Sequence, residues 1–96
     1  MNNIQFDLDL FKKSSLRERQ IVALLAQGMR TKDIARELCV SHDTIESHRH
    51  NIIRKTGLKT SPRIVAEFVK GGLIYWCVIR GTWAHAEKMS VAQIKV

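Results

Sequence analysis

Hydroxyl residues and glycines divide the middle of this chain into short segments, and this punctuation most constrains its fold. Ser15 stands before an apolar segment and Glu18 follows three residues later, which is the pattern of a capping box at a helix N-terminus. Gly28 is placed as the left-handed residue that ends a helix. The sequence therefore predicts a helix over about 16–27 and a second over about 31–38.

Capping residues and glycines also mark the helix ends between residues 41 and 72. Ser41 is placed to cap a third helix over 42–56, and Gly57 stops it. The inward positions of that helix follow a three-and-four spacing: Ile45, His48, Ile52 and Thr56. Ser61-Pro62 has the pattern of a hydroxyl cap followed by proline at the first helical position. A fourth helix is therefore expected from there to Gly71-Gly72.

The two ends of the chain have different patterns. Apolar and polar residues alternate over 4–10, which predicts a half-buried strand or a loose arm. Residues 73–83 are β-branched and aromatic, as in a strand, and the last dozen residues indicate a weak helix or a frayed tail. We interpret the chain as an arm (1–13), a domain (14–74) and a C-terminal extension (75–96).

Length and composition exclude several classes. A chain of 96 residues, 45% apolar and 26% charged, is typical of one small globular domain and too short for a two-domain enzyme. Cys39 and Cys77 are too few for a disulfide framework and are expected to be free thiols in a reducing compartment. No apolar run is long enough for a signal peptide or a membrane span, so we expect a cytoplasmic protein that does not bind a membrane.

The charge balance favours a polyanionic partner. The 16 Lys and Arg residues against 9 Asp and Glu give a formal charge of +7, which favours nucleic acid first and a membrane surface second. Between residues 49 and 63 the sequence contains no carboxylate but five basic residues: Arg49, Arg54, Lys55, Lys59 and Arg63. This stretch is predicted to bind phosphates.

The second and third helices have the spacing of a helix-turn-helix. Two helices that meet at a turn of three to four residues need small or apolar side chains where they touch. The predicted core of this motif consists of Ala35, Val40 and Ile45, with Cys39 at the turn. The third helix leaves a polar face that could enter a major groove: His42, Asp43, Glu46, Ser47, His50 and Arg54.

From about residue 14 to residue 74 the chain resembles the LuxR-type (GerE- or FixJ-like) DNA-binding domain of bacterial transcription regulators. The matching segments are Ser15-Leu16-Arg17-Glu18, Ala26-Gln27-Gly28, Lys32-Asp33-Ile34-Ala35, Ser41, Thr44-Ile45, His48, Asn51-Ile52, Lys55 and Gly72-Leu73-Ile74. The resemblance implies an all-α, four-helix LuxR-type fold with short extensions at both ends. It also implies sequence-specific binding of double-stranded DNA in transcription regulation.

The resemblance implies roles for single residues. Glu46, Ser47 and His50 would face the bases, together with His42 and Asp43 on the same face. The residues expected to contact the DNA backbone are Lys32, Thr44, Arg49, Arg54, Lys55 and Lys59. The chain departs from the family pattern at Ser14, Glu46, Thr56 and Ser61. Where the family often has lysine, Glu46 weakens phosphate attraction and is expected to accept a hydrogen bond from a cytosine amino group.

The sequence favours DNA binding over metal binding and catalysis. His42, Glu46 and His50 recur every four residues and could ligate zinc, but a closed site needs four ligands and DNA-facing residues explain the same spacing. No nucleophile, base and acid have a spacing that suggests a catalytic site. We therefore expect no metal, no cofactor and no enzymatic activity.

Two other functions remain open. A polymerase-binding sigma-type region shares the Arg-Glu and Ile-Ala motifs. A protein-interaction module, such as an anti-activator or co-regulator, would keep the fold and pair with another regulator through it or through residues 73–96. Tyr75, Trp76 and Trp83 would either pack on the core or form a dimer interface, alone or paired with a strand at 4–10. We expect a stand-alone regulator, because the chain has no room for a receiver domain, and a homodimer, because family members commonly bind paired half-sites.

Overall fold

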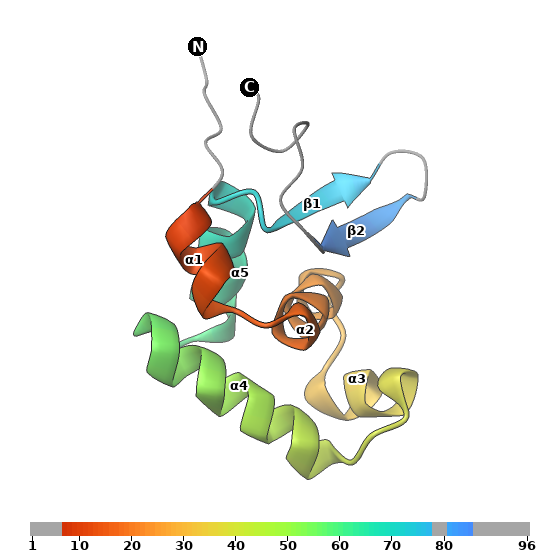
Figure 1. Ribbon diagram of the computed structural model, residues 1–96. Helices are drawn as coiled ribbons and strands as arrows, with labels where there is room; N and C mark the ends of the chain where they lie inside the picture. Colours follow the sequence, from red (N-terminus) through yellow and green to blue (C-terminus); the bar gives the residue numbers. More distant parts are fainter. Residues whose placement is uncertain (1–6, 78–80, 86–96) are drawn as a thin grey trace.

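Five helices and a two-stranded sheet make up the residues that the computed structural model describes, 7–77 and 81–85 (Figure 1). The elements are α1 (Leu8–Lys13), α2 (Leu16–Ala26), α3 (Thr31–Leu38), α4 (His42–Thr56), α5 (Ser61–Lys70), β1 (Ile74–Cys77) and β2 (Thr82–His85). The four predicted helices are therefore confirmed as α2 to α5. The all-α, four-helix description is wrong in two respects, because α1 is an additional helix and the aromatic segment forms a sheet.

The predicted helix ends are confirmed, with one exception. Ser15 and Glu18 form the capping box, and Gly28 and Gly57 have positive φ angles of 88° and 75°. The hydroxyl of Thr60, not that of Ser61, accepts the hydrogen bond from the Arg63 N–H (3.3 Å). Both neighbours carry the same hydroxyl group, so the sequence pattern alone could not separate the two positions.

The strand predicted for 4–10 is wrong where it can be compared, because residues 8–10 belong to α1; residues 1–6 lie outside the described part. The Asp7 side chain caps this helix by accepting from the Leu10 N–H (3.0 Å), and Leu10 is only 8% exposed. The Asp7 N–H donates to the Gly71 carbonyl (2.8 Å). A Cβ on Gly71 would lie 2.8 Å from that of Asp7, so this approach requires glycine. A six-residue helix is too short to show its period in the sequence.

The buried Arg19 joins α1 to α2. Its Nη1 donates to the Ser14 carbonyl (2.7 Å), to the Ser14 hydroxyl (3.0 Å) and to the Phe11 carbonyl (3.2 Å). The guanidinium also lies 4.1 Å from the centre of the Phe11 ring. Burial lowers the pKa of Arg19, and the neighbouring Glu18 carboxylate opposes this effect. The carbonyls at the end of α1 are therefore satisfied by a charged side chain of α2.

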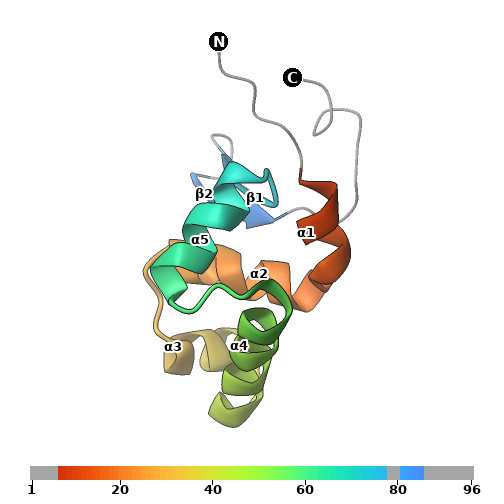
Figure 2. The ribbon, with the colours of Figure 1, turned by 90° about the vertical axis from the view of Figure 1, so that its left-hand side faces the viewer.

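The core has two parts, which lie on two sides of α2. The turn cluster consists of Ile21, Ile34, Ala35 and Ile45. The main cluster consists of Leu10, Val22, Ala23, Ile52, Ile64, Phe68, Leu73 and Ile74. Three successive residues of α2 are thus buried, and the helix lies centrally with α3 and α4 on one side and the sheet on the other (Figures 1 and 2).

The strand character predicted for 73–83 is confirmed, whereas the packing prediction holds only in part. β1 and β2 are antiparallel, with Trp76 opposite Trp83 and their rings edge to face at 5.8 Å. Trp83 packs against the main cluster, but Tyr75 is 43% and Trp76 53% exposed. In the described sheet β1 pairs with β2 and not with the N-terminal segment. The weak helix or frayed tail expected for the last dozen residues falls mostly on 86–96, outside the described residues.

Candidate nucleic-acid interface

The helix-turn-helix is formed by α3, α4 and the turn between them. Ala35 and Ile45 are buried in the turn cluster, and Val40 packs against it. Cys39 adopts a left-handed conformation (φ 58°), which among the described residues is otherwise found at glycines. The Val40 N–H donates to the Ala35 carbonyl (3.0 Å), which closes the end of α3. The residues predicted for the core of the motif thus lie together between its two helices.

One face of α4 is polar and open to solvent. Ile45 and Ile52 on its inner face are fully buried. The exposed residues of the outer face are His42, Asp43, Ser47, His50 and Arg54. Thr44 is partly buried, and its N–H donates to the Ser41 hydroxyl (3.1 Å). Both ribbon views place α4 at the lower edge of the molecule, so this face is accessible to a large partner (Figures 1 and 2).

Glu46 is partly buried within this face and is held by its neighbours. Its Oε1 accepts from Arg49 Nη2 (3.2 Å), and its Oε2 lies 3.5 Å from His42 Nε2. The same His42 nitrogen lies 3.0 Å from the Thr31 hydroxyl of α3. Partial burial raises the pKa of Glu46, but hydrogen bonds from Thr31 and Arg49 and the charges of Arg49 and His42 outweigh it, so the pKa is lowered overall. This carboxylate is therefore ionised and fixed in orientation.

At the other end of α4, Lys55 is paired with a buried carboxylate. Its Nζ donates to Glu18 Oε1 (2.7 Å), and the Ser15 N–H donates to the same oxygen (2.9 Å). Glu18 therefore both caps α2 and holds the last turn of α4. The capping-box pattern identified Glu18 in the sequence, but no sequence signal connected it with a lysine 37 residues away.

Residues 49–63 contain five basic side chains and no carboxylate, but three of these side chains are paired with carboxylates from outside this stretch. The absence of carboxylates thus holds along the sequence but not in space. Arg49 pairs with Glu46, Lys55 with Glu18, and Arg63 with Glu67 (3.9 Å). Arg54 instead donates to the Asn51 side chain (2.9 Å) and stays exposed.

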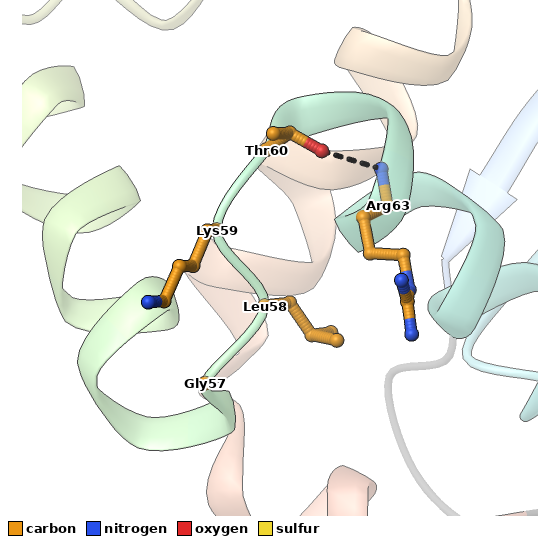
Figure 3. A pocket seen from close by; sticks show the side chains of 5 residues that line it. All are labelled: Gly57, Leu58, Lys59, Thr60 and Arg63. Atoms are coloured by element: carbon orange, nitrogen blue, oxygen red, sulfur yellow. Dashed lines mark hydrogen bonds between the residues drawn. The ribbon is translucent and has the colours of Figure 1, made fainter.

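A shallow pocket lies at the loop between α4 and α5. It is lined by Gly57, Leu58, Lys59, Thr60 and Arg63 (Figure 3). The side chains of Lys59 and Arg63 point in different directions, and the Thr60 hydroxyl accepts from the Arg63 N–H. The pocket therefore gathers no converging set of polar groups. Lys59 and Lys32 are both exposed on the surface.

The candidate metal ligands in the sequence are His42, Glu46 and His50. Within the part of the chain that the structure describes, no three His, Cys, Asp or Glu side chains are grouped so that they could hold a metal ion. His42 and Glu46 instead belong to the hydrogen-bonded network with Thr31 and Arg49. In the same residues no helix has the length and apolar character needed to cross a membrane.

Comparison with known proteins agrees with this geometry. Residues 15–67 match the luxR family of bacterial regulatory proteins. The matched segment runs from the cap of α2 into α5, so α1, β1 and β2 lie outside it. No solved structure matches the chain.

The chain is also similar to longer regulators. It is 42% identical over 66 residues to the oxygen regulatory protein NreC of Staphylococcus aureus, in strains JH9, JH1 and Mu3 alike. The similarity covers 69% of this chain but 30% of each NreC protein. The chain belongs to the luxR family of bacterial regulatory proteins, and its helix-turn-helix is a DNA-binding module of transcription regulation.

Proposed function

We propose that this protein binds double-stranded DNA sequence-specifically, with α4 in the major groove. The observation that carries the proposal is the continuous polar outer face of α4, opposite the buried Ile45 and Ile52. A major groove admits one α-helix and offers donors and acceptors that distinguish the four base pairs. The side chains proposed to reach base edges are His42, Asp43, Glu46, Ser47 and His50.

Glu46 is the residue from which we expect the clearest base preference. A carboxylate can accept from the N4 amino group of cytosine but repels phosphates and acceptor-only base edges. Arg49 and His42 hold the Glu46 carboxylate, so less side-chain freedom is lost when it meets a base. Arg49 is also proposed to contact the DNA backbone while it holds Glu46, because a guanidinium has five N–H donors and the contacts with Glu46 use two.

The phosphate contacts would come from around this face. We propose Lys32, Thr44, Arg49, Arg54, Lys55 and Lys59 as the residues that contact the backbone. Lys55 would do so while it remains bound to Glu18, because an ammonium has three donors and the pair with Glu18 uses one. Such contacts fix the register of the protein on the duplex but carry no sequence information.

The test is selection of bound duplexes from a random library at near-physiological salt. Wild type is compared with Arg54→Ala/Lys55→Ala and with Lys70→Ala, which removes a charge at the end of α5. We expect a recovered motif that the double variant binds more weakly and Lys70→Ala binds normally. Failure of the wild type to enrich any duplex would contradict the proposal.

A second experiment tests the reading of cytosine. Wild type and Glu46→Lys are assayed on the selected duplex and on duplexes that differ from it at single base pairs. We expect Glu46→Lys to bind all of them more evenly, because lysine adds phosphate attraction and removes the acceptor. An unchanged order of preference would contradict the role of Glu46.

The protein is further proposed to act as a homodimer on paired half-sites, in the cytoplasm, where bacterial DNA lies. Sedimentation with and without the selected duplex tests the dimer. The NreC proteins that match this chain are longer than it is, so stand-alone action stays an untested prediction.

A second candidate function is a module that pairs with another regulator. It is favoured by the exposed aromatic side chains of Tyr75 and Trp76, which lie on opposite faces of the sheet because they are successive residues of β1. Salt dependence separates the two functions: affinity for a duplex falls with a slope of about −0.9 per phosphate contacted, in a plot of log K against log salt. Association with a protein through exposed aromatic side chains would lack this steep dependence.

A further inference from the structure

Helix α1 is outside the matched family segment, yet it is an integral part of the described fold. Leu10 is buried in the main cluster, and α1 packs against α4. Its start is hydrogen-bonded to Gly71 through the Asp7 N–H, and its end to Arg19. One end of α1 is therefore bonded to the end of α5 and the other to α2.

The last turn of α1 lies at the same end of the molecule as the last turn of α4. The Lys55 ammonium and the Ser15 N–H donate to one oxygen, Glu18 Oε1. Ser15 is only two residues beyond Lys13, the last residue of α1. Both ribbon views show α1 running down toward α4, so its C-terminal turn is the part nearest the proposed DNA face (Figures 1 and 2).

Both of these helix ends are basic and exposed. α1 ends with Lys12 and Lys13, and α4 ends with Arg54 and Lys55. Lys13 pairs with Asp9 (3.2 Å), whose side chain is itself largely exposed, so this pair is weak and open to exchange. Lys12 has no ion pair within the described residues. Four exposed basic side chains thus stand at two neighbouring helix ends, at the C-terminal end of the polar face of α4.

We propose that Lys12 and Lys13 of α1 contact the phosphate backbone of duplex DNA that flanks the base pairs read by α4. The inference rests on the proposed function, because it presumes α4 in the groove. It is carried by charge complementarity and by continuity with the Lys55 end of α4. The lysines extend the footprint along the backbone without adding base preference.

The proposal is tested with three variants: Lys12→Ser, Lys13→Ser and Lys70→Ser. Each removes one positive charge from the last turn of a helix. Lys70 is the matched control. It precedes Gly71, which is bonded to Asp7 at the start of α1, so it lies at the opposite end of α1 from Lys12 and Lys13. Affinity for the selected duplex is measured over a series of salt concentrations, with far-UV circular dichroism to verify folding.

We expect the plot of log K against log salt to become shallower by about 0.9 for Lys12→Ser and for Lys13→Ser, and to be unchanged for Lys70→Ser. The order of preference among single-base variants of the duplex should stay the same. A fourth variant, Asp9→Asn, removes the carboxylate that competes for Lys13 and should strengthen binding.

Two failures can be told apart. In the first, the wild type binds duplex and Arg54→Ala/Lys55→Ala binds it more weakly, but Lys12→Ser and Lys13→Ser keep the wild-type slope. This result refutes the role of α1 and leaves the proposed function standing. If all three charge variants lose the same slope, the effect is one of net charge and the inference is likewise refuted. If the wild type binds no duplex, the proposed function itself fails.

Discussion

The two parts of the core differ in where their residues come from. The turn cluster is built from α2, α3 and α4 alone, all within the segment that matches the luxR family. The main cluster takes Leu10 from α1 and Leu73 and Ile74 from the chain after α5, all outside that segment. The turn cluster is thus complete within the family segment, whereas the main cluster also needs residues on either side of that segment.

The two clusters are connected by α2. Ile21 belongs to the turn cluster, while Val22 and Ala23 belong to the main cluster. A helix buried on two sides transmits a loss of packing from one cluster to the other. We therefore expect one cooperative unfolding transition. Substitutions in and around the clusters test whether they differ in their contribution to the free energy of unfolding.

The largest effect is expected for Phe68→Ala in the main cluster. Phe68 is fully buried, and its loss should lower the free energy of unfolding by about 3–5 kcal/mol. Denaturation is followed by far-UV circular dichroism, which reports the helices, and by fluorescence of Trp76 and Trp83, which lie in the sheet. Coincident transitions are expected for wild type and variant; separate transitions would show that the clusters unfold independently.

The next effect concerns α1. Leu10→Ala should lower the free energy of unfolding by about 2–3 kcal/mol, because it opens a cavity at the edge of the main cluster. Leu8→Ala is the matched control, since Leu8 is 40% exposed on the same helix, and should change it by less than about 0.5 kcal/mol. Equal small effects for both would show that α1 only lies on the surface of the domain.

A smaller effect is expected for the bond between the two helices at Glu18. Glu18→Gln keeps the shape but removes the charge that Lys55 and the Ser15 N–H bind, at a cost of about 1–2 kcal/mol in unfolding free energy. Glu67→Gln removes a more exposed partner of Arg63 and should cost less than about 0.5 kcal/mol. Chemical denaturation near neutral pH measures both, and equal costs would contradict the role assigned to Glu18.

The smallest effect concerns Glu46 and depends on pH. Since the pKa of Glu46 is lowered in the folded protein, its ionised form stabilises the fold above the carboxylate pKa of the unfolded chain. This stabilisation is lost as the pH falls below the carboxylate pKa of the unfolded chain and then through the lower folded pKa. The unfolding free energies of wild type and Glu46→Gln should differ by less than about 1 kcal/mol near neutral pH, and the difference should shrink as the solution is made acidic. A difference that does not change with pH would refute this.

Local signals predicted the local structure well. Capping residues and glycines placed the ends of α2, α3 and α4 within one residue, because these signals act through hydrogen bonds over three or four positions. The same kind of signal failed for α1. Asp7 is a capping residue, but the helix is short and stable only through Leu10 in the main cluster and the contacts of Asp7 and Arg19.

For the candidate site, the sequence predicted which side chains α4 would turn toward solvent but not what holds them. The spacing placed Ile45 and Ile52 inside and His42, Ser47 and His50 outside. It could not show that Arg49 binds Glu46 in preference to standing free, since both are compatible with the same helix.

The sequence by itself determined the four helices, the tight turn at Cys39 and the resemblance to the luxR family, because all of these depend on residues close together in the chain. Only the tertiary structure decided that Lys55 binds Glu18, that Asp7 meets Gly71 and that α1 ends beside the last turn of α4. These contacts join residues tens of positions apart. Such contacts form only once the main cluster has brought the helices together, and no periodicity in the sequence reports them.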